Sequence, residues 1–130
     1  MNLDPASKEI FDLTQKLLHS IATADWKAYE DLCDPSLTCF EPEAHGQLVQ
    51  GLAFHRFYFQ LGPANEGHET TICSPTIRVS GDFAVIAYVR LNQRLSADGS
   101  PKESAVEETR VWQRTGGKWR HVHFHRSPIK

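Results

Sequence analysis

Three arginines lie in apolar or aromatic stretches of this chain, where a permanent positive charge is unexpected. Arg90 follows Ile86–Val89, Arg126 follows Val122–His125, and Arg110 precedes a Val-Trp pair. A guanidinium group stays charged in proteins, and burying one without a partner costs several kcal/mol. Such residues therefore indicate either a cavity that supplies a counter-charge or a strand face that is in contact with water.

Strand alternation indicates which side chains share a face with each arginine. Each arginine shares its face with an aromatic residue: Arg90 with Tyr88, Arg110 with Trp112 and Arg126 with Phe124. For any one of them, an outward side chain in solvent is the alternative. Three arginines that all share a face with aromatic residues favour a shared cluster on a concave surface.

The turn between the last two strands tests this cluster. A two-residue Gly116-Gly117 turn would place Arg110 and Arg126 on opposite faces, whereas a three-residue Thr115–Gly117 turn with a bulge would place them on one face. The cluster hypothesis therefore predicts the longer turn.

Glu108 shares the face of Arg110 and is the expected internal counter-ion. One carboxylate cannot neutralise three guanidinium groups. We therefore expect the remaining charge to bind a small anion, and a carboxylate held bidentately fits this role.

The histidines suggest contacts rather than a metal site. His121, His123 and His125 alternate and are expected on one face, about 7 Å apart, which is too far for easy convergence on one ion. If that face meets another subunit, assembly would be sensitive to pH. His55 lies in an aromatic run at residues 54–59, and either a pocket-wall or a core position fits it.

The motifs of catalysis are missing from the sequence. Glu107 and Glu108 are adjacent on a strand and face opposite ways, so they cannot act together. G-x-S-x-G, H-E-x-x-H and phosphate-binding glycine motifs are absent. We expect no catalytic residue, metal or cofactor, although a Tyr/Asp or His/Glu proton-transfer pair would leave no spacing to detect.

The order of elements predicts an α+β domain. Helices are expected at about residues 5–23, 25–32 and 52–59, with a short strand at 37–40, and four long strands follow near 69–79, 82–95, 103–114 and 118–127. The economical arrangement is a curved antiparallel sheet around the first helix, with a pocket between them. Residues 61–68 are expected to form a mobile surface loop.

Composition narrows the classes of partner. The 130 residues include 23% charged residues with a net charge of −2, which argues against nucleic acid. A membrane span and a signal peptide are both absent from the sequence, so we expect a cytoplasmic protein. Three cysteines without C-x-x-C spacing favour reduced thiols, with a Cys33–Cys39 disulfide as the alternative.

Several blocks of the chain resemble the association (hub) domain family of calcium/calmodulin-dependent protein kinase II, within the NTF2-like/SnoaL-like α+β cone superfamily. The resemblance covers residues 8–127. Its most specific blocks are Phe40-Glu41-Pro42-Glu43-Ala44, Phe54-His55-Arg56-Phe57-Tyr58-Phe59, Glu107-Glu108-Thr109-Arg110-Val111-Trp112 and Val122-His123-Phe124-His125-Arg126-Ser127.

The resemblance implies one hub domain over residues 1–130, with its core at about 5–127. In that family the domain is non-catalytic and forms stacked rings of dimers, roughly dodecameric or larger, that tether kinase domains. It also implies a pocket containing Arg90, Arg110 and Arg126, with Tyr29 and His55 at its wall, for a small carboxylate or an acidic peptide side chain.

Two other functions stay open. One is a small-carboxylate-binding protein or SnoaL-like enzyme that uses the same pocket, and the other is a platform that recruits a peptide carboxylate. The sequence shows no kinase domain and no calmodulin-binding segment, and only a short lead precedes the first helix. An excised domain and a stand-alone hub-like protein both fit. The loop at 61–68 lacks the tryptophan of the family's loop.

Overall fold

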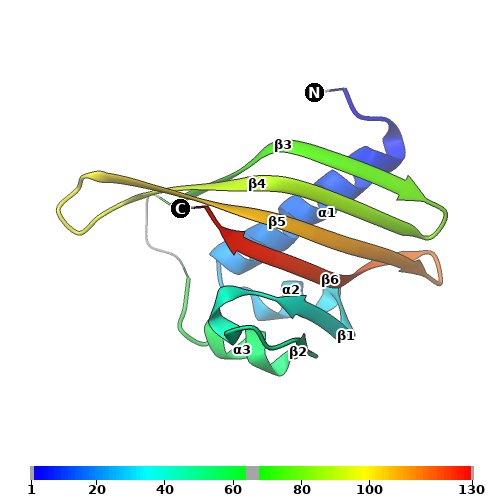
Figure 1. The fold of residues 1–130 in the computed structure, drawn as a ribbon, viewed down its shortest axis with the longest axis horizontal. Coiled ribbons are helices and arrows are strands. Elements are labelled where there is room, and N and C mark those ends of the chain that lie inside the picture. The colour runs from blue at the N-terminus through cyan, green and yellow to red at the C-terminus, as the bar shows by residue number, and fades with distance from the viewer. Residues whose placement is uncertain (1, 64–67, 130) are drawn as a thin grey trace.

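The computed structural model describes residues 2–63 and 68–129. Residues 64–67 of the expected surface loop lie outside the described residues. The elements, in chain order, are α1 (Pro5–Ala22), α2 (Trp26–Leu32), β1 (Cys33–Phe40), the 3-10 turn η1 (Pro42–Ala44), β2 (Val49–Gln50), α3 (Ala53–Phe59), β3 (Glu69–Ser80), β4 (Phe83–Leu95), β5 (Pro101–Thr115) and β6 (Lys118–Pro128) (Figure 1).

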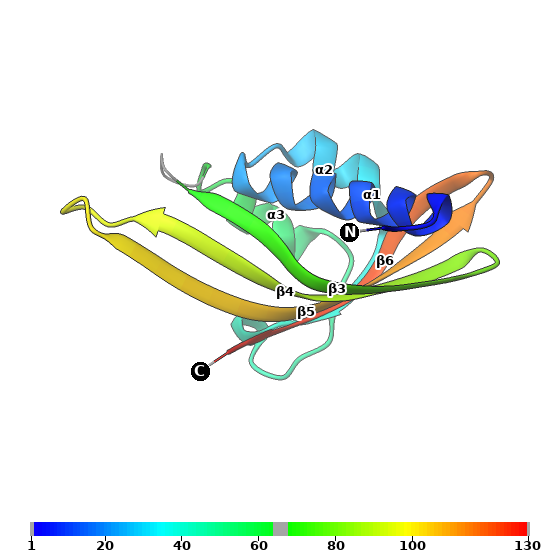
Figure 2. The ribbon, with the colours of Figure 1, turned by 90° about the horizontal axis from the view of Figure 1, so that it is seen from above.

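The predicted α+β class is confirmed. The described strands form one open, curved sheet in the order β2-β1-β6-β5-β4-β3, and the helices lie on its concave side (Figure 2). Neighbouring strands are antiparallel except β1 and β6, which run parallel. The sequence did not reveal β2, because a two-residue strand has no periodicity to detect.

Helix α1 begins as its sequence predicts. The Asp4 side chain accepts a hydrogen bond from the Ser7 backbone N–H at 2.8 Å, and Pro5 occupies the first turn, where its missing N–H is not needed. Ile10 and Leu17 are fully buried against the sheet. In the same layer, Trp112 Nε1 donates to Thr14 Oγ1 at 3.2 Å, which ties the helix to β5.

The turn between β5 and β6 differs from the prediction. Thr115 pairs with Lys118, so the turn has two residues, Gly116 and Gly117, at φ 59° and 77°. Positive φ at both positions is what a tight type I′ hairpin requires and what glycine adopts readily. The three-residue turn that we expected is therefore wrong.

A β-bulge at Val122 has the effect that we expected of the longer turn, which is to place Arg110 and Arg126 on one face. Trp112 pairs with His121 but Val111 pairs with His123, so Val122 is an extra residue in β6. The alternation reverses at this point, and Arg126 returns to the face that carries Arg110. The cluster forms through a bulge within the ladder.

The same bulge corrects the prediction for the histidines, which do not share a face. His121 precedes the bulge and lies on the inner face, fully buried beside Trp112. His123 and His125 follow it and lie on the outer face. Their imidazoles lie near the ring of Phe40 from β1, at centroid distances of 6.2 and 5.7 Å.

The three thiols at Cys33, Cys39 and Cys73 are free. Cys33 and Cys39 are buried, and the alternative of a disulfide between them is not realised.

Candidate functional site

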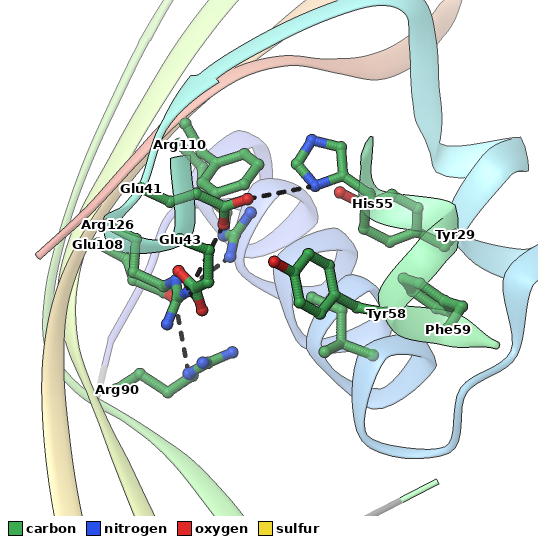
Figure 3. A pocket seen from close by; sticks show the side chains of 12 residues that line it. Tyr29, Glu41, Glu43, His55, Tyr58, Phe59, Arg90, Glu108, Arg110 and Arg126 are labelled. Carbon is green, nitrogen blue, oxygen red and sulfur yellow. Dashed lines mark hydrogen bonds and ion pairs between the residues drawn. The ribbon is translucent and has the colours of Figure 1, made fainter. Parts of the chain in front are cut away.

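The inner faces of β4, β5 and β6 carry a cluster of charged side chains around a cavity of about 250 Å³ (Figure 3). Register explains the grouping, because Tyr88, Glu108 and Arg126 occupy paired positions on three adjacent strands. The charged lining residues are Glu41, Glu43, Arg90, Glu108, Arg110 and Arg126. The aromatic wall includes Tyr29, His55, Tyr58, Phe59 and Phe124.

Arg110 is the most deeply buried of the three arginines and contacts Tyr88, Glu108 and Phe124. Its Nε donates to Tyr88 Oη at 2.9 Å, its Nη2 donates to Glu108 Oε1 at 3.2 Å, and its guanidinium carbon lies 4.6 Å from the Phe124 ring centre. Burial alone opposes the charged form, but Tyr88 and Glu108 outweigh it and raise the pKa of Arg110. Arg110 is therefore a structural cation with little capacity for a guest.

Glu108 is the shared counter-ion that the sequence predicted. Its Oε1 also accepts from the Tyr88 hydroxyl at 2.5 Å, and its Oε2 lies 3.5 Å from Arg90 Nε. Burial opposes ionisation of this carboxyl, yet Arg110 and Arg90 lower its pKa. The carboxylate is thus held ionised between two cations in the interior.

Arg90 is the least satisfied of the three arginines. Within the described residues, Arg90 Nε and Glu108 Oε2 are buried without a hydrogen-bond partner. Burial lowers the pKa of Arg90, although the guanidinium stays charged at any ordinary pH. Arg90 Nε and Glu108 Oε2 form an ion pair at 3.5 Å without a hydrogen bond, so a bound anion would supply the hydrogen bond that Arg90 does not obtain from Glu108.

Two carboxylates that the sequence analysis missed accompany Arg126. Its Nη2 contacts both carboxylate oxygens of Glu43 and lies 3.5 Å from Glu41 Oε2. Both glutamates flank the start of η1, just after β1. They meet Arg126 because β1 runs parallel to β6, and such pairing between segments far apart leaves no local pattern. The described residues therefore line the cavity with three guanidinium groups and three carboxylates, and the premise of one counter-ion for three cations is corrected.

His55 is both a pocket-wall and a buried residue, so the two positions left open by the sequence are both realised. Its Nδ1 lies 3.6 Å from Glu41 Oε1, and Nε2 lies 3.7 Å from Cys39 Sγ. Burial, then Arg110 and Arg126, lower the pKa of His55 to about 4, so the imidazole is neutral at pH 7.

Tyr29 is also buried at the wall of the cavity. Its ring centre lies 6.1 Å from that of His55 and 4.8 Å from that of Phe59. Burial raises the pKa of the Tyr29 hydroxyl well above its usual value, so it remains protonated and can act as a donor.

Cys39, His55 and Glu41 lie in the order of a nucleophile, a base and an orienting carboxylate. Such an arrangement performs acyl transfer only when the thiol is accessible and readily ionised. Cys39 is fully buried, and burial raises its thiol pKa to about 12. Together with the low pKa of His55, this excludes a resident thiolate–imidazolium pair and argues against nucleophilic chemistry at Cys39.

The same three side chains bring one donor atom each to within 4.8 Å of one another, which is close enough to consider a divalent metal ion. A thiol, an imidazole and a carboxylate are ligands that zinc accepts. However, Arg110 and Arg126 lie close enough to lower the pKa of His55, and the same positive field would repel a cation. The positive field at His55 therefore argues against a metal cation at these three side chains.

Comparisons with known proteins place the chain in a family. The profile of the calcium/calmodulin dependent protein kinase II association domain matches residues 6–130. The chain belongs to this association-domain family. It is 50% identical, over 95% of its length, to the delta subunit of calcium/calmodulin-dependent protein kinase type II from Oryctolagus cuniculus, and it spans 25% of that relative.

The fold agrees with this membership. The association domain of the Caenorhabditis elegans (C. elegans) kinase superposes with a TM-score of 0.89 at 42% identity, over 95% of this chain and 99% of that one. An NTF2-like protein from Salmonella enterica matches with a TM-score of 0.75 at 23% identity, over 95% and 92% of the two chains, which shows the shared fold alone. The NTF2-like architecture predicted for this association domain is confirmed. Among the described helices, none combines the length and the apolar character that crossing a bilayer requires.

Proposed function

We propose that this association domain is a non-catalytic oligomerisation hub that assembles with itself into stacked rings of dimers. The observation that carries the proposal is the family match over residues 6–130. We take residues 1–130 as a single hub domain with its core at about 5–127, acting in the cytoplasm. A tethered kinase domain is the partner that the family suggests.

The outer face of the sheet supports self-association. The helices lie on the concave side of the sheet (Figure 2). Phe83 and Val85 of β4 alternate with the buried Ala84 and Ile86, so they face the opposite side, and they are 51% and 39% exposed. Val111 of β5 pairs with Val85 and extends this apolar surface. Contiguous exposed apolar residues on a soluble domain mark an interaction surface.

Light scattering coupled to size exclusion tests the hub. One chain has a mass of 14.7 kDa, and we expect a discrete species of about twelve subunits or more at micromolar concentration. A monomer or a simple dimer would refute the ring.

We further propose that the cavity binds a carboxylate, either a small acid or an acidic side chain of a peptide. Its support is Arg90, whose buried Nε makes an ion pair with Glu108 Oε2 at 3.5 Å but no hydrogen bond among the described residues. Tyr29 and His55 add neutral polar groups to the wall. A cavity of about 250 Å³ has the volume of roughly eight water molecules, at about 30 Å³ each, which suits a small acid.

A binding experiment tests this pocket separately from assembly. Propionate titrated into the native assembly should bind, and Arg90→Ala should abolish that binding while the assembly mass stays unchanged. Binding that survives Arg90→Ala would place the anion elsewhere.

The second candidate function is a small-carboxylate-binding protein or a SnoaL-like enzyme that uses the same cavity. The buried neutral His55 beside Glu41 is the observation that favours it, because such a pair can transfer a proton. Turnover of a small acid that His55→Gln abolishes would support this candidate over a passive hub.

A further inference from the structure

The carboxylate pocket already contains a carboxylate at its mouth. Glu43 lies in η1, and both of its oxygens contact Arg126 Nη2. Its side chain is 38% exposed, whereas that of Glu41 is 8% exposed and that of Glu108 is fully buried. Figure 3 shows Glu43 beside Arg126, on the sheet side of the cavity and across from Tyr58 and Phe59.

The balance of charge makes this contact a problem for any anionic guest. Among the described residues, three guanidinium groups and three carboxylates line the cavity. A further carboxylate would add a negative charge next to Glu43 and Glu41 in a partly desolvated space, where like charges repel strongly. A guest must therefore either displace one of the resident carboxylates or bring a proton with it.

The contacts identify the carboxylate that can leave. Glu108 is held by Tyr88 and Arg110 in the interior. Glu41 is buried between His55 and Arg126. Glu43 is the most exposed of the three, and its contact among the described residues is with Arg126, so this is the ion pair that exchanges most readily for water.

We propose that Glu43 is a built-in competitor for Arg126, and that a guest carboxylate binds by replacing the Glu43 carboxylate, which turns out into solvent. The inference rests on the proposed carboxylate pocket. A guest in this position would use Arg126 on one side and Arg90 on the other, since both flank Glu108. An aspartate or glutamate side chain of a peptide carries the same functional group as Glu43 and is the natural replacement.

Calorimetric titration of the native assembly at pH 7 and constant ionic strength tests the competition, with sodium propionate as the probe and propionamide as its neutral counterpart. Glu43→Gln keeps the shape of the side chain and removes its charge. We expect it to bind propionate about two- to tenfold tighter than the unaltered protein, as loss of a partly exposed ion pair allows. Glu43→Ala should behave alike, and propionamide should bind none of them.

Glu107→Gln is the matched control. Glu107 adjoins Glu108 on β5 but is exposed on the opposite face, so its substitution removes the same charge without touching the cavity. We expect unchanged affinity for propionate. If Glu107→Gln tightens binding as much as Glu43→Gln, the effect reflects net charge alone and the competitor role is wrong.

A second measurement separates displacement from protonation. Titrations in two buffers with different ionisation enthalpies report the protons taken up with the guest. Displacement of Glu43 predicts no uptake at pH 7, whereas one proton per propionate would show that the guest or a resident carboxyl is neutralised instead, which overturns the inference.

The outcomes also separate this inference from the pocket itself. If the unaltered protein binds propionate and Glu43→Gln binds it no tighter, Glu43 is not a competitor and the pocket stands. If the unaltered protein, Glu43→Gln and Glu43→Ala all fail to bind propionate at tens of millimolar, the pocket and the role of Glu43 are both wrong.

Discussion

Replacing Glu108 by Gln should destabilise this domain far more than an isosteric change usually does. The substitution removes the charge that Arg110 and Arg90 share, and it leaves a fully buried guanidinium beside a neutral amide. Removing one partner of a buried ion pair typically costs about 3–5 kcal/mol, because the remaining charge is uncompensated. We expect a loss of about 3 kcal/mol for Glu108→Gln, since the amide oxygen can still accept one hydrogen bond.

Chemical denaturation at a fixed protomer concentration measures this loss, because the stability of an assembly depends on concentration. Glu107→Gln, one residue away and exposed, should change the free energy of unfolding by less than about 0.5 kcal/mol. A cost for Glu108→Gln below about 1 kcal/mol would refute the reasoning, since Arg110 would then need no counter-ion.

The pH dependence gives an independent check. The folded-state pKa of Glu108 is lowered from 4.5, so its ionised form stabilises the fold above that pH, and this contribution is lost as the pH falls through the folded-state value. The difference in stability between the unaltered protein and Glu108→Gln should therefore be constant near neutrality and shrink below about pH 4.5. A difference that persists unchanged into strong acid would contradict an ionised Glu108.

Three further predictions follow from the described contacts. Deletion of Val122 removes the β-bulge and reverses the faces of residues 123–126. The deletion should either unfold the domain, which circular dichroism would show, or abolish propionate binding, which calorimetry would show. A stable deletion variant that still binds propionate would contradict this register. Thr14→Val keeps the volume but leaves Trp112 Nε1 without its acceptor, and it should cost about 1–3 kcal/mol in denaturation. Thr23→Val is the control: it removes an exposed hydroxyl that donates to the His19 carbonyl, and it should cost less than about 0.5 kcal/mol. Burial, with Arg110 and Arg126, lowers the pKa of His55 from 6.5 to about 4, so neutral His55 contributes its full stabilisation above pH 6.5 and this contribution is lost as the pH falls towards 4. NMR titration should find His55 neutral at pH 5.5. A titration midpoint near 6.5 would refute its burial beside these cations.

Local patterns predicted the elements of this fold well. The Asp4-Pro5 cap, the helical spacing of Ile10 and Leu17, and the glycine turns between long alternating runs each depend on neighbours in sequence. These features fix where helices and strands begin and end. The α+β class and the concave cluster of arginines followed from them.

The errors arose where pairing between distant segments decides the outcome. The bulge at Val122 has no glycine or proline to mark it, so simple alternation placed His121 on the wrong face. Glu41 and Glu43 reach Arg126 only through the parallel contact of β1 with β6. The charge balance of the site was therefore beyond reach of a local reading, although the arginines themselves were not.

The extra residue in β6 has a consequence for reading related sequences. The face of the sheet on which Arg126 lies depends on whether the number of residues between the hairpin and the arginine is odd or even. The identity of the residue alone does not reveal that face. A relative that keeps the arginine but lacks one residue after its hairpin would align well and yet present that charge to bulk water. Alignments of this strand are therefore best anchored at the arginine and extended towards the hairpin. A gap between the two indicates that the arginine has moved to the other face of the sheet.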